Sequence, residues 1–352
     1  AMESVFALVD LYFVGHLKDS QNAMQTVGFT ESVLTIMYSI AIGMSMAATA
    51  VVARRVGEKN PEAAGHSGAQ AIMIASTITI VLSLAGIYFA TDILLLMGAT
   101  PEAAAQGTMF TRIMMGSGIV IMLLFLINGI FRGAGNAAIA MKSLWIANIC
   151  NIILCPVFIN GFLFIPAFGL TGAAMATAIG RSIGVLYQLY HLFYGKHQLD
   201  IRISQFKADF KVIKSLVAIA MPAIFQFVIA SCSWIFLAEL VAETGGSAGS
   251  AGYQTALRLM MFFMLPAWGL SNAASTLVGQ NLGALNIKRA EDSVMTTVKY
   301  NVIFMLSVSV IFFLLSDWLV SFFTSDPATI AMAESALHVM SIGFVFYGIG
   351  MV

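Results

Sequence analysis

A carboxylate lies inside an apolar stretch near the start of the chain. Asp10 falls within FALVDLYFVG and has no cationic neighbour in sequence. Ionisable residues inside a membrane are costly and by default mark ion or substrate paths. Because burial favours the neutral form of a carboxyl group, Asp10 is suited to taking up and releasing a proton. The alternative reading is structural, with Asp10 serving helix association alone.

Five other polar side chains also interrupt apolar runs and are candidates to line a substrate cavity. They are Arg181, Gln226, Tyr253, Gln254 and Tyr347. A charged or hydrogen-bonding group in such surroundings needs a partner, water or a ligand. Arg181 could line the cavity or cross-link helices, and both readings stay open.

The sequence offers no histidine-based metal site and no nucleotide-binding motif. Its five histidines lack metal-ligand spacing, and no P-loop motif is present. Cys150, Cys155 and Cys232 fall inside apolar segments without paired spacing, so disulfides are not expected. The 17 Lys and Arg residues balance the 17 Asp and Glu residues, which argues against nucleic-acid binding. We therefore predict no cofactor and no nucleic-acid partner.

These residues belong to a chain suited to the bilayer. Of its 352 residues, 59% are hydrophobic and only 10% are charged, against about a quarter in a soluble chain. Apolar runs of about 20 residues, the length that crosses a bilayer, recur along it. We predict an all-α polytopic membrane protein with ten helices, the first cut short. The predicted helices are 1–14, 30–53, 67–91, 107–131, 139–160, 169–194, 212–241, 252–279, 291–316 and 328–352.

Positive charge is unevenly distributed between the loops. The loops after the second, fourth, sixth and eighth helices hold nearly all the loop Lys and Arg residues, whereas the opposite loops hold only Lys18. Because Lys and Arg mark the cytoplasmic side, even-numbered helices are expected to end in the cytoplasm. The predicted location is a bacterial-type cytoplasmic (inner) membrane.

A block of sequence recurs 226 residues later in the same register. Residues 43–64 align with residues 269–290, and Pro101 still falls on Pro327 without a gap. Internal symmetry of this kind is typical of secondary transporters. An even number of crossings separates equivalent positions, so we expect a parallel repeat of two six-helix lobes around a central cleft.

The repeat also predicts the domain boundaries. An amino-terminal lobe is expected at residues 1–194, a cytoplasmic inter-lobe linker at 195–211 and a carboxyl-terminal lobe at 212–352. The offset would place the end of a complete second lobe well beyond residue 352, so we expect its last two helices to be missing. The mixed charge and interspersed apolar residues of the linker predict a short amphipathic segment along the membrane surface.

Four stretches of the chain together resemble one known family. LVDLYFVGHL, RGAGNAAIAMK, GLTGAAMATAIG and LVGQNLGALNIKRAE look like the multidrug and toxic compound extrusion (MATE) transporters, and the likeness covers essentially the whole chain. The resemblance implies a twelve-helix exporter with two six-helix lobes, driven by a proton or sodium gradient. It also implies a transporter and not an enzyme.

The resemblance further implies a cation-coupling site in the first lobe. Asp10 matches the family's coupling acid, Asn128 its Asn on the fourth helix and Asn151 its Asn on the fifth. Cys155 stands where many relatives have an Asp, which removes the second carboxylate of a two-acid site. Since positions i and i+4 share a helix face, Asn151 and Cys155 are still expected to point into one cavity. A sodium ion at Asp10, Asn128 and Asn151 is one predicted form of the site.

Glu3 offers a replacement for the missing acid. It lies seven residues before Asp10 on roughly the same helical face, about 10 Å away along the axis. We hypothesise that Glu3 and Asp10 form the acidic pair that other family members build from two helices. In the alternative reading, Glu3 pairs with Arg112 or Arg181 for structure.

The sequence thus predicts a secondary antiporter that exports drugs, organic cations or metabolites by alternating access, with protons or sodium as the coupling ion. Its expected partners are a small lipophilic or cationic substrate and the lipid bilayer, and it is expected to act as a monomer. The alternative is a lipid-linked oligosaccharide flippase of the same broad superfamily, which a strongly cationic central cavity would favour. A membrane prenyltransferase ranks last, because the predicted helices carry no Asp-rich cluster for a metal-bound diphosphate.

Overall fold

The computed structural model describes residues 20–162, 166–195, 199, 201–321 and 326–352. In this part of the chain the regular structure is helical, without a β-strand. The chain divides into two compact units, unit 1 (Ala1–Phe227) and unit 2 (Val228–Val352). The predicted all-α membrane fold class is confirmed.

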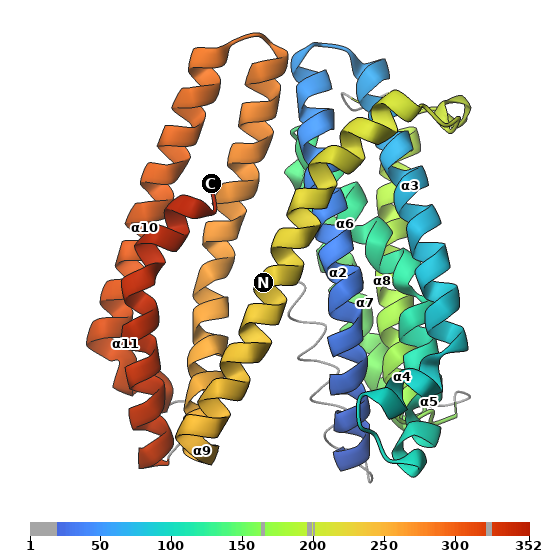
Figure 1. Cartoon of the computed structure of the whole chain (residues 1–352). Coiled ribbons are helices and arrows are strands. Elements are labelled where there is room, and N and C mark those ends of the chain that lie inside the picture. Colours follow the sequence, from blue (N-terminus) through green and yellow to red (C-terminus); the bar gives the residue numbers. More distant parts are fainter. Residues whose placement is uncertain (1–19, 163–165, 196–198, 200, 322–325) are drawn as a thin grey trace. The chain divides into compact units, whose positions relative to one another are not determined.

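Unit 1 is a bundle of long helices with two short connecting elements (Figure 1). In chain order they are α2 (Ser20–Gly57), α3 (Pro61–Tyr88), α4 (Ala90–Leu96), α5 (Pro101–Gly116), α6 (Gly118–Gly133), α7 (Ala137–Asn160), α8 (Leu170–Tyr194), the 3-10 turn η1 (Ile203–Gln205) and the first part of α9 (Phe210–Gly283). The most extensive packing joins α7 to α8 and α2 to α6. These two pairs form the frame of the unit.

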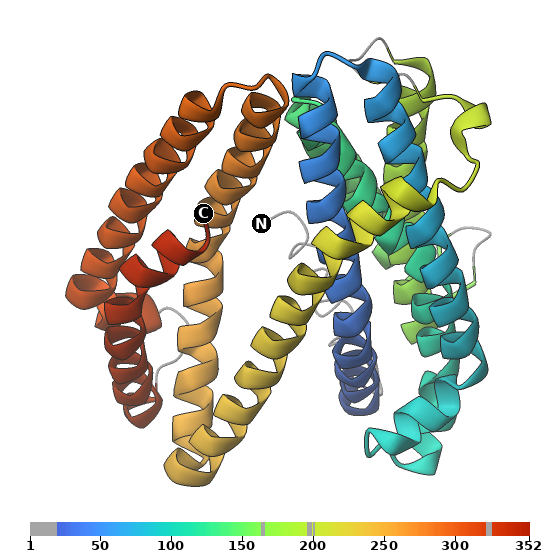
Figure 2. The ribbon, with the colours of Figure 1, turned by 45° about the horizontal axis from the view of Figure 1, so that its top comes forward.

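Unit 2 contains the rest of α9 together with α10 (Ile287–Ser321) and α11 (Pro327–Gly350). The α9 backbone turns sharply at Gly246, where φ is 59° and ψ is −152°, a conformation that glycine adopts without steric cost. Pro222 and Pro266 lie within helical parts of α9. In Figure 2 the orange α10 and the red α11 lie side by side, and they pack on each other extensively.

Eight segments of the described chain are long and apolar enough to cross a membrane. They are Gln25–Gly57, Pro61–Tyr88, Pro101–Gly133, Ala137–Asn160, Phe210–Ala238, Gly249–Gly283, Ile287–Ser321 and Pro327–Gly350. At about 37 Å, α8 is also long enough to span a bilayer. It is absent from the eight, and its buried positions include Thr177, Arg181 and Gln188. The expected short first helix lies outside the described residues.

Several helix boundaries differ from those predicted by hydropathy. The helix α2 begins at Ser20 rather than near residue 30, because its first turns are polar but still helical. The run 67–91 continues past a break at Phe89 into α4, and the run 107–131 is interrupted at Ser117 between α5 and α6. Apolar length predicts where the chain crosses, but it carries no information about breaks within a crossing.

The turns that join α2 to α3 and α9 to α10 share backbone details 226 residues apart. Lys59 and Leu285 are the described non-glycine residues with positive φ, at 55° and 58°. The next residues, Asn60 and Asn286, each cap the following helix by accepting a backbone N–H three positions on, at 2.9 and 3.2 Å. Asparagine is a favoured N-cap because its side-chain oxygen satisfies an otherwise unpaired amide.

Two further details recur at the same offset. The hydroxyl of Ser45 donates to the carbonyl of Phe125 at 2.8 Å, and the hydroxyl of Ser271 donates to the carbonyl of Met351. The backbone leaves helical geometry at Phe89 (φ −94°, ψ 13°) and again within α10 (φ −125°, ψ 15°), at the equivalent position. The two units therefore share local backbone geometry well beyond the residues that are identical.

Candidate functional site

Small residues on α8 allow it to pack very closely on α7. A Cβ added at Gly180 would lie 2.8 Å from the carbonyl oxygen of Ala147, and one added at Gly172 would lie 2.4 Å from the carbonyl oxygen of Phe158. Gly184 is equally restricted, because its Cβ would lie 3.0 Å from the carbonyl oxygen of Ser143. Small residues at four-residue spacing let membrane helices approach in this way. The polar side chains of α7 are thereby held against those of α8.

The first polar contact produced by this packing involves Asn151. Its Nδ2 donates to Thr177 Oγ1 at 2.9 Å, and both side chains are buried. Among the described residues, the buried Oδ1 atom of Asn151 has no hydrogen-bond partner. Cys155 lies one turn further along α7 and is also fully buried. The structure therefore places Asn151 and Cys155 together in the interior of unit 1.

A second polar cluster surrounds Gln188. Its Nε2 donates to Asn128 Oδ1 at 2.7 Å, to Ser143 Oγ at 3.0 Å and to the carbonyl of Leu124 at 3.3 Å. Ser143 also donates to Asn128 Oδ1, at 3.2 Å. Asn128 is thus engaged by α7 and α8, whereas the Asn151 contact lies eight residues further along α7, about 12 Å along the axis. The structure does not join Asn128 and Asn151 in one cluster.

Arg181 is buried in the same unit and contacts an aromatic side chain of α2. Its guanidinium donates to the hydroxyl of Tyr38 at 2.8 Å and lies 5.8 Å from the centre of that ring. Tyr38 in turn packs edge-on against Phe125 of α6, with ring centres 5.9 Å apart. The arginine therefore cross-links α8 to α2, one of the two roles expected for it.

The remaining candidate cavity residues are distributed over both units. Gln226 lies in unit 1 and has an exposed side chain. Tyr253 is buried in unit 2, Gln254 is exposed there, and Tyr347 is 49% exposed. Their assignment to a common substrate cavity stays a prediction.

The predicted acids Asp10 and Glu3 lie outside the described residues. Within the described part of the chain, no group of three or more His, Cys, Asp or Glu side chains is placed to hold a metal ion. The described oxygen groups at the Asn151 contact are its own amide and the hydroxyl of Thr177.

Thr177, Gln188, Ser143 and Tyr38 were not predicted as members of the site. A signal for the first two was present, because Thr177, Arg181 and Gln188 recur at four- and seven-residue spacing on one face of an otherwise apolar helix. Ser143 and Tyr38 carry no such pattern. Their roles depend on the tertiary packing of α7 and α2.

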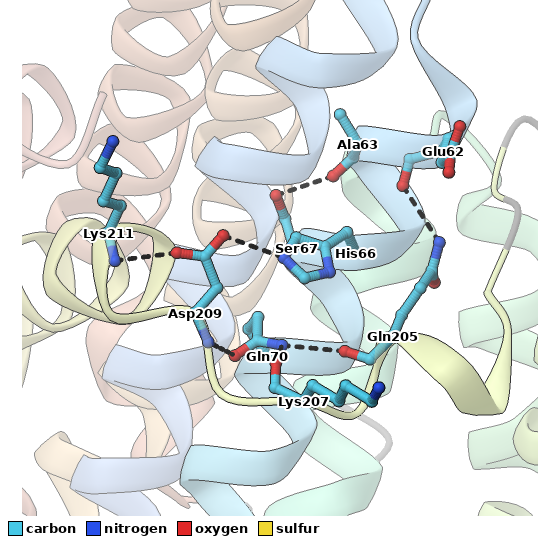
Figure 3. Close-up of polar contacts among 9 residues, drawn as sticks. All are labelled: Glu62, Ala63, His66, Ser67, Gln70, Gln205, Lys207, Asp209 and Lys211. Atoms are coloured by element: carbon cyan, nitrogen blue, oxygen red, sulfur yellow. Dashed lines mark hydrogen bonds and ion pairs between the residues drawn. The ribbon is translucent and has the colours of Figure 1, made fainter.

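A third polar network fixes residues 205–209, which fall in the predicted linker, on α3, as Figure 3 shows. The side chain of Gln70 donates to the carbonyls of Gln205 and Lys207, at 2.9 and 2.7 Å, and accepts the N–H of Asp209 at 3.0 Å. His66 Nε2 lies 3.2 Å from Asp209 Oδ2. Hydrogen bonding from His66, then from the backbone N–H of Lys211, lowers the pKa of the Asp209 carboxyl below its usual value.

Apolar anchors accompany these hydrogen bonds. Leu199 and Ile201 of the linker are buried in the main apolar cluster of unit 1, and Ile201 packs against Gly68 of α3. The segment 199–209 is therefore held on the helices of unit 1 and includes the short turn η1.

Comparison with known proteins gives a consistent result. The MatE family profile matches residues 1–157 and 222–352. The chain is 23% identical over 343 residues to a probable multidrug resistance protein NorM of Thermotoga maritima, covering 97% of this chain and 73% of that protein. It is 24% identical over 347 residues to the multidrug export protein MepA of Staphylococcus aureus, covering 98% and 75%. A crystal structure of MATE in the bent conformation superposes with a TM-score of 0.92 at 23% identity, covering all of this chain and 77% of that one.

Proposed function

Because this chain belongs to the MatE family of transporters, we propose that it exports small lipophilic or cationic compounds in exchange for protons or sodium. It is a transporter and not an enzyme. The two relatives described above are named for multidrug resistance and multidrug export, which supports the substrate class.

The observation that carries the proposal is the buried polar interior between α7 and α8. Asn151 Oδ1 is enclosed next to Thr177 and Cys155, and no described residue donates a hydrogen bond to it. Leaving such a group unpaired costs about 1–3 kcal/mol, so a site of this kind favours a ligand that donates to it or coordinates it. We assign the coupling ion to this position, with Asp10 as the charged partner and Glu3 as its candidate second acid.

The donor set near Asn151 favours the proton over sodium. Hard cations prefer oxygen ligands, and Cys155 supplies a sulfur where a carboxylate would serve a cation better. Asn128 Oδ1 is already engaged by Gln188 and Ser143. For sodium to bind at Asp10, Asn128 and Asn151, Asn128 Oδ1 would therefore have to give up its hydrogen bond from Gln188.

In the proposed transport cycle, the lobes 1–194 and 212–352 expose a central cleft to each side of the membrane in turn, and the linker 195–211 joins them. The matched turns at Asn60 and Asn286 support a duplicated unit. The cleft is proposed to include Arg181, Gln226, Tyr253, Gln254 and Tyr347. The protein acts as a monomer in a bacterial cytoplasmic membrane, with even-numbered helices ending in the cytoplasm.

The test is efflux of a lipophilic cationic dye from proteoliposomes under separately imposed proton and sodium gradients. The wild type is expected to export the dye under the proton gradient, and Asp10→Asn is expected to abolish that efflux. Glu31→Gln, which neutralises an acid elsewhere in unit 1, serves as the control. Absence of efflux under either gradient from folded protein would contradict the exporter assignment.

A further inference from the structure

The interface between α10 and α11 in unit 2 contains three polar layers. Asn301 Nδ2 donates to the carbonyl of Gly348 at 2.8 Å, and Ser309 Oγ donates to the carbonyl of Ser341 at 2.9 Å. Ser316, seven residues after Ser309, forms the third layer. The layers follow at seven- and eight-residue intervals, so they lie on one face of α10. Two of them satisfy backbone carbonyls, whereas the third joins ionisable side chains.

In this third layer, one hydroxyl lies between an imidazole and a carboxylate. Ser316 is 2% exposed, and its Oγ lies 3.1 Å from His338 Nε2 and 3.3 Å from Glu334 Oε1. Glu334 and His338 are four residues apart on α11 and therefore share a face. The imidazole stacks on Phe313 of α10, with ring centres 4.8 Å apart and an interplanar angle of 11°. The stacking restrains the imidazole and keeps Nε2 within reach of the hydroxyl.

The side chains of Ser316, Glu334 and His338 can form their hydrogen bonds in either of two directions while all their heavy atoms stay in place. In one, His338 Nε2–H donates to Ser316 Oγ, and the hydroxyl donates to the Glu334 carboxylate. In the other, a protonated Glu334 donates to Oγ, and the hydroxyl donates to an unprotonated Nε2. A hydroxyl can serve as donor and acceptor at once, so every group stays bonded in both states.

The equivalent layer of unit 1 lacks this chemistry. The positions 226 residues before Ser316, Glu334 and His338 are Ala90, Thr108 and Arg112. Thr108 there forms a hydroxyl–hydroxyl contact with Thr91, at 3.0 Å. Both layers follow the same helix break, so a neutral contact is sufficient for the fold. The ionisable groups of unit 2 therefore need an explanation beyond packing.

Other ionisable side chains occur on the helices that pack here. They include Asp317, Lys299 and Tyr300 on α10, Asp326 at the start of α11, Tyr347 near its end, and Glu243, Tyr253 and Arg258 on α9. Lys288, Arg289, Glu291 and Asp292 lie in the first turns of α10. All of these are exposed except Tyr253, which is buried. Among the described residues, no ion pair joins Glu334 or His338 to any of them. The two groups thus interact chiefly through Ser316.

We propose that Ser316, Glu334 and His338 form a proton-binding relay in unit 2. A proton from water enters at His338 Nδ1 and gives an imidazolium. The Nε2 proton then passes to Ser316 Oγ while the hydroxyl proton passes to Glu334 Oε1. One proton has been taken up, the hydroxyl is restored, and Glu334 is neutral. Histidine is suited to this role because it ordinarily titrates near neutral pH.

The test is a pH titration by difference infrared spectroscopy of the whole protein in lipid nanodiscs. The carbonyl band of a protonated carboxylic acid is expected to appear as pH falls, and Glu334→Gln is expected to remove it. Ser316→Ala is expected to shift the pH midpoint of that band, because the carboxylate loses its hydroxyl donor. Ser316→Thr, which keeps the hydroxyl, should restore the midpoint.

Asp317→Asn is the matched control, because it removes the adjacent carboxylate outside the relay and should leave the band unchanged. His338→Gln keeps a donor but cannot titrate, and it tests the relay if Ser316→Ala does not fold. The relay is refuted if Glu334→Gln leaves the acid band intact, or if the midpoint is the same in wild type, Ser316→Ala and His338→Gln. The measurement needs no substrate, so its outcome is independent of the export assay.

Discussion

The helix pair α3 and α5 in unit 1 and the pair α10 and α11 in unit 2 occupy equivalent positions in the chain, yet their interfaces differ in chemistry. Ala75, Ala90 and Met115 of unit 1 correspond to Asn301, Ser316 and Ser341 of unit 2. The turns and the helix break are alike in both. Backbone geometry thus persists between the units while the interior side chains diverge.

Unit 1 concentrates its polar interior elsewhere, between α6, α7 and α8. There, glycines bring α8 onto the α7 backbone, and amide side chains supply the hydrogen bonds. Unit 2 instead holds a carboxylate and an imidazole at a helix break. Close helix packing and titratable side chains therefore occur in different parts of the molecule, so a substitution can change one without changing the other.

The largest effect is expected from filling the α7–α8 contact. Gly180→Leu would place side-chain atoms against the Ala147 carbonyl, which cannot yield as a flexible side chain does. We expect a loss of about 3 kcal/mol or more in unfolding free energy, at the upper end of overpacking costs. Gly343→Leu is the control, because nothing lies within 4 Å of a Cβ at that helical glycine. Equal thermal stability of the two variants would contradict the close-packing account.

Removing the amide of Gln188 is expected to have the next largest effect. Gln188→Leu deletes the donor to Asn128, Ser143 and Leu124 in a fully buried position. Losing these buried hydrogen bonds should cost about 2 kcal/mol of unfolding free energy, although Asn128 Oδ1 keeps its bond from Ser143. Gln226→Leu, which changes an exposed glutamine in the same unit, should cost little. Denaturant titration of both variants in the same detergent measures the two losses of unfolding free energy, and equal losses would contradict the role of the Gln188 amide.

A smaller effect compares the two units directly. Ser45→Ala and Ser271→Ala remove hydroxyls that donate to equivalent carbonyls. Each should cost about 1 kcal/mol in unfolding free energy. The Ser45 variant should lose more, because its hydroxyl also accepts from Arg132 at 3.0 Å. A larger loss in Ser271→Ala, measured by thermal unfolding, would overturn this order.

The smallest effect concerns the docked linker and its dependence on pH. Because the folded-state pKa of Asp209 is lowered, the stabilisation it provides is present above about pH 4, the ordinary aspartate value, and is lost as pH falls through the lower folded value. Amide hydrogen exchange across 201–209, corrected for intrinsic rates, should quicken over that acidic range. Asp209→Asn should abolish the pH dependence. A wild-type profile that matches this variant at every pH would rule out a role for the carboxylate.

Sequence reasoning succeeded where apolar length or repeated motifs carried the information. It predicted the helical membrane class and the family. The assignment of Asn151 and Cys155 to one cavity stays a prediction, and the structure shows both side chains buried on α7. It did not predict Thr177 or Gln188, although their spacing was visible. It could not predict the Ser316 layer, because the contact joins residues whose proximity depends on how α10 packs on α11.

Two native cysteines of α7 provide the most direct test of the claim that the coupling ion acts beside Asn151. Cys155 is fully buried next to that site, whereas Cys150 on the same helix is partly exposed. We expect the rate of alkylation of Cys155 by a membrane-permeant maleimide, corrected for thiolate fraction, to change severalfold between neutral and acidic pH. The rate at Cys150 should stay constant. If both cysteines respond alike, or neither responds, the coupling site does not lie at Asn151.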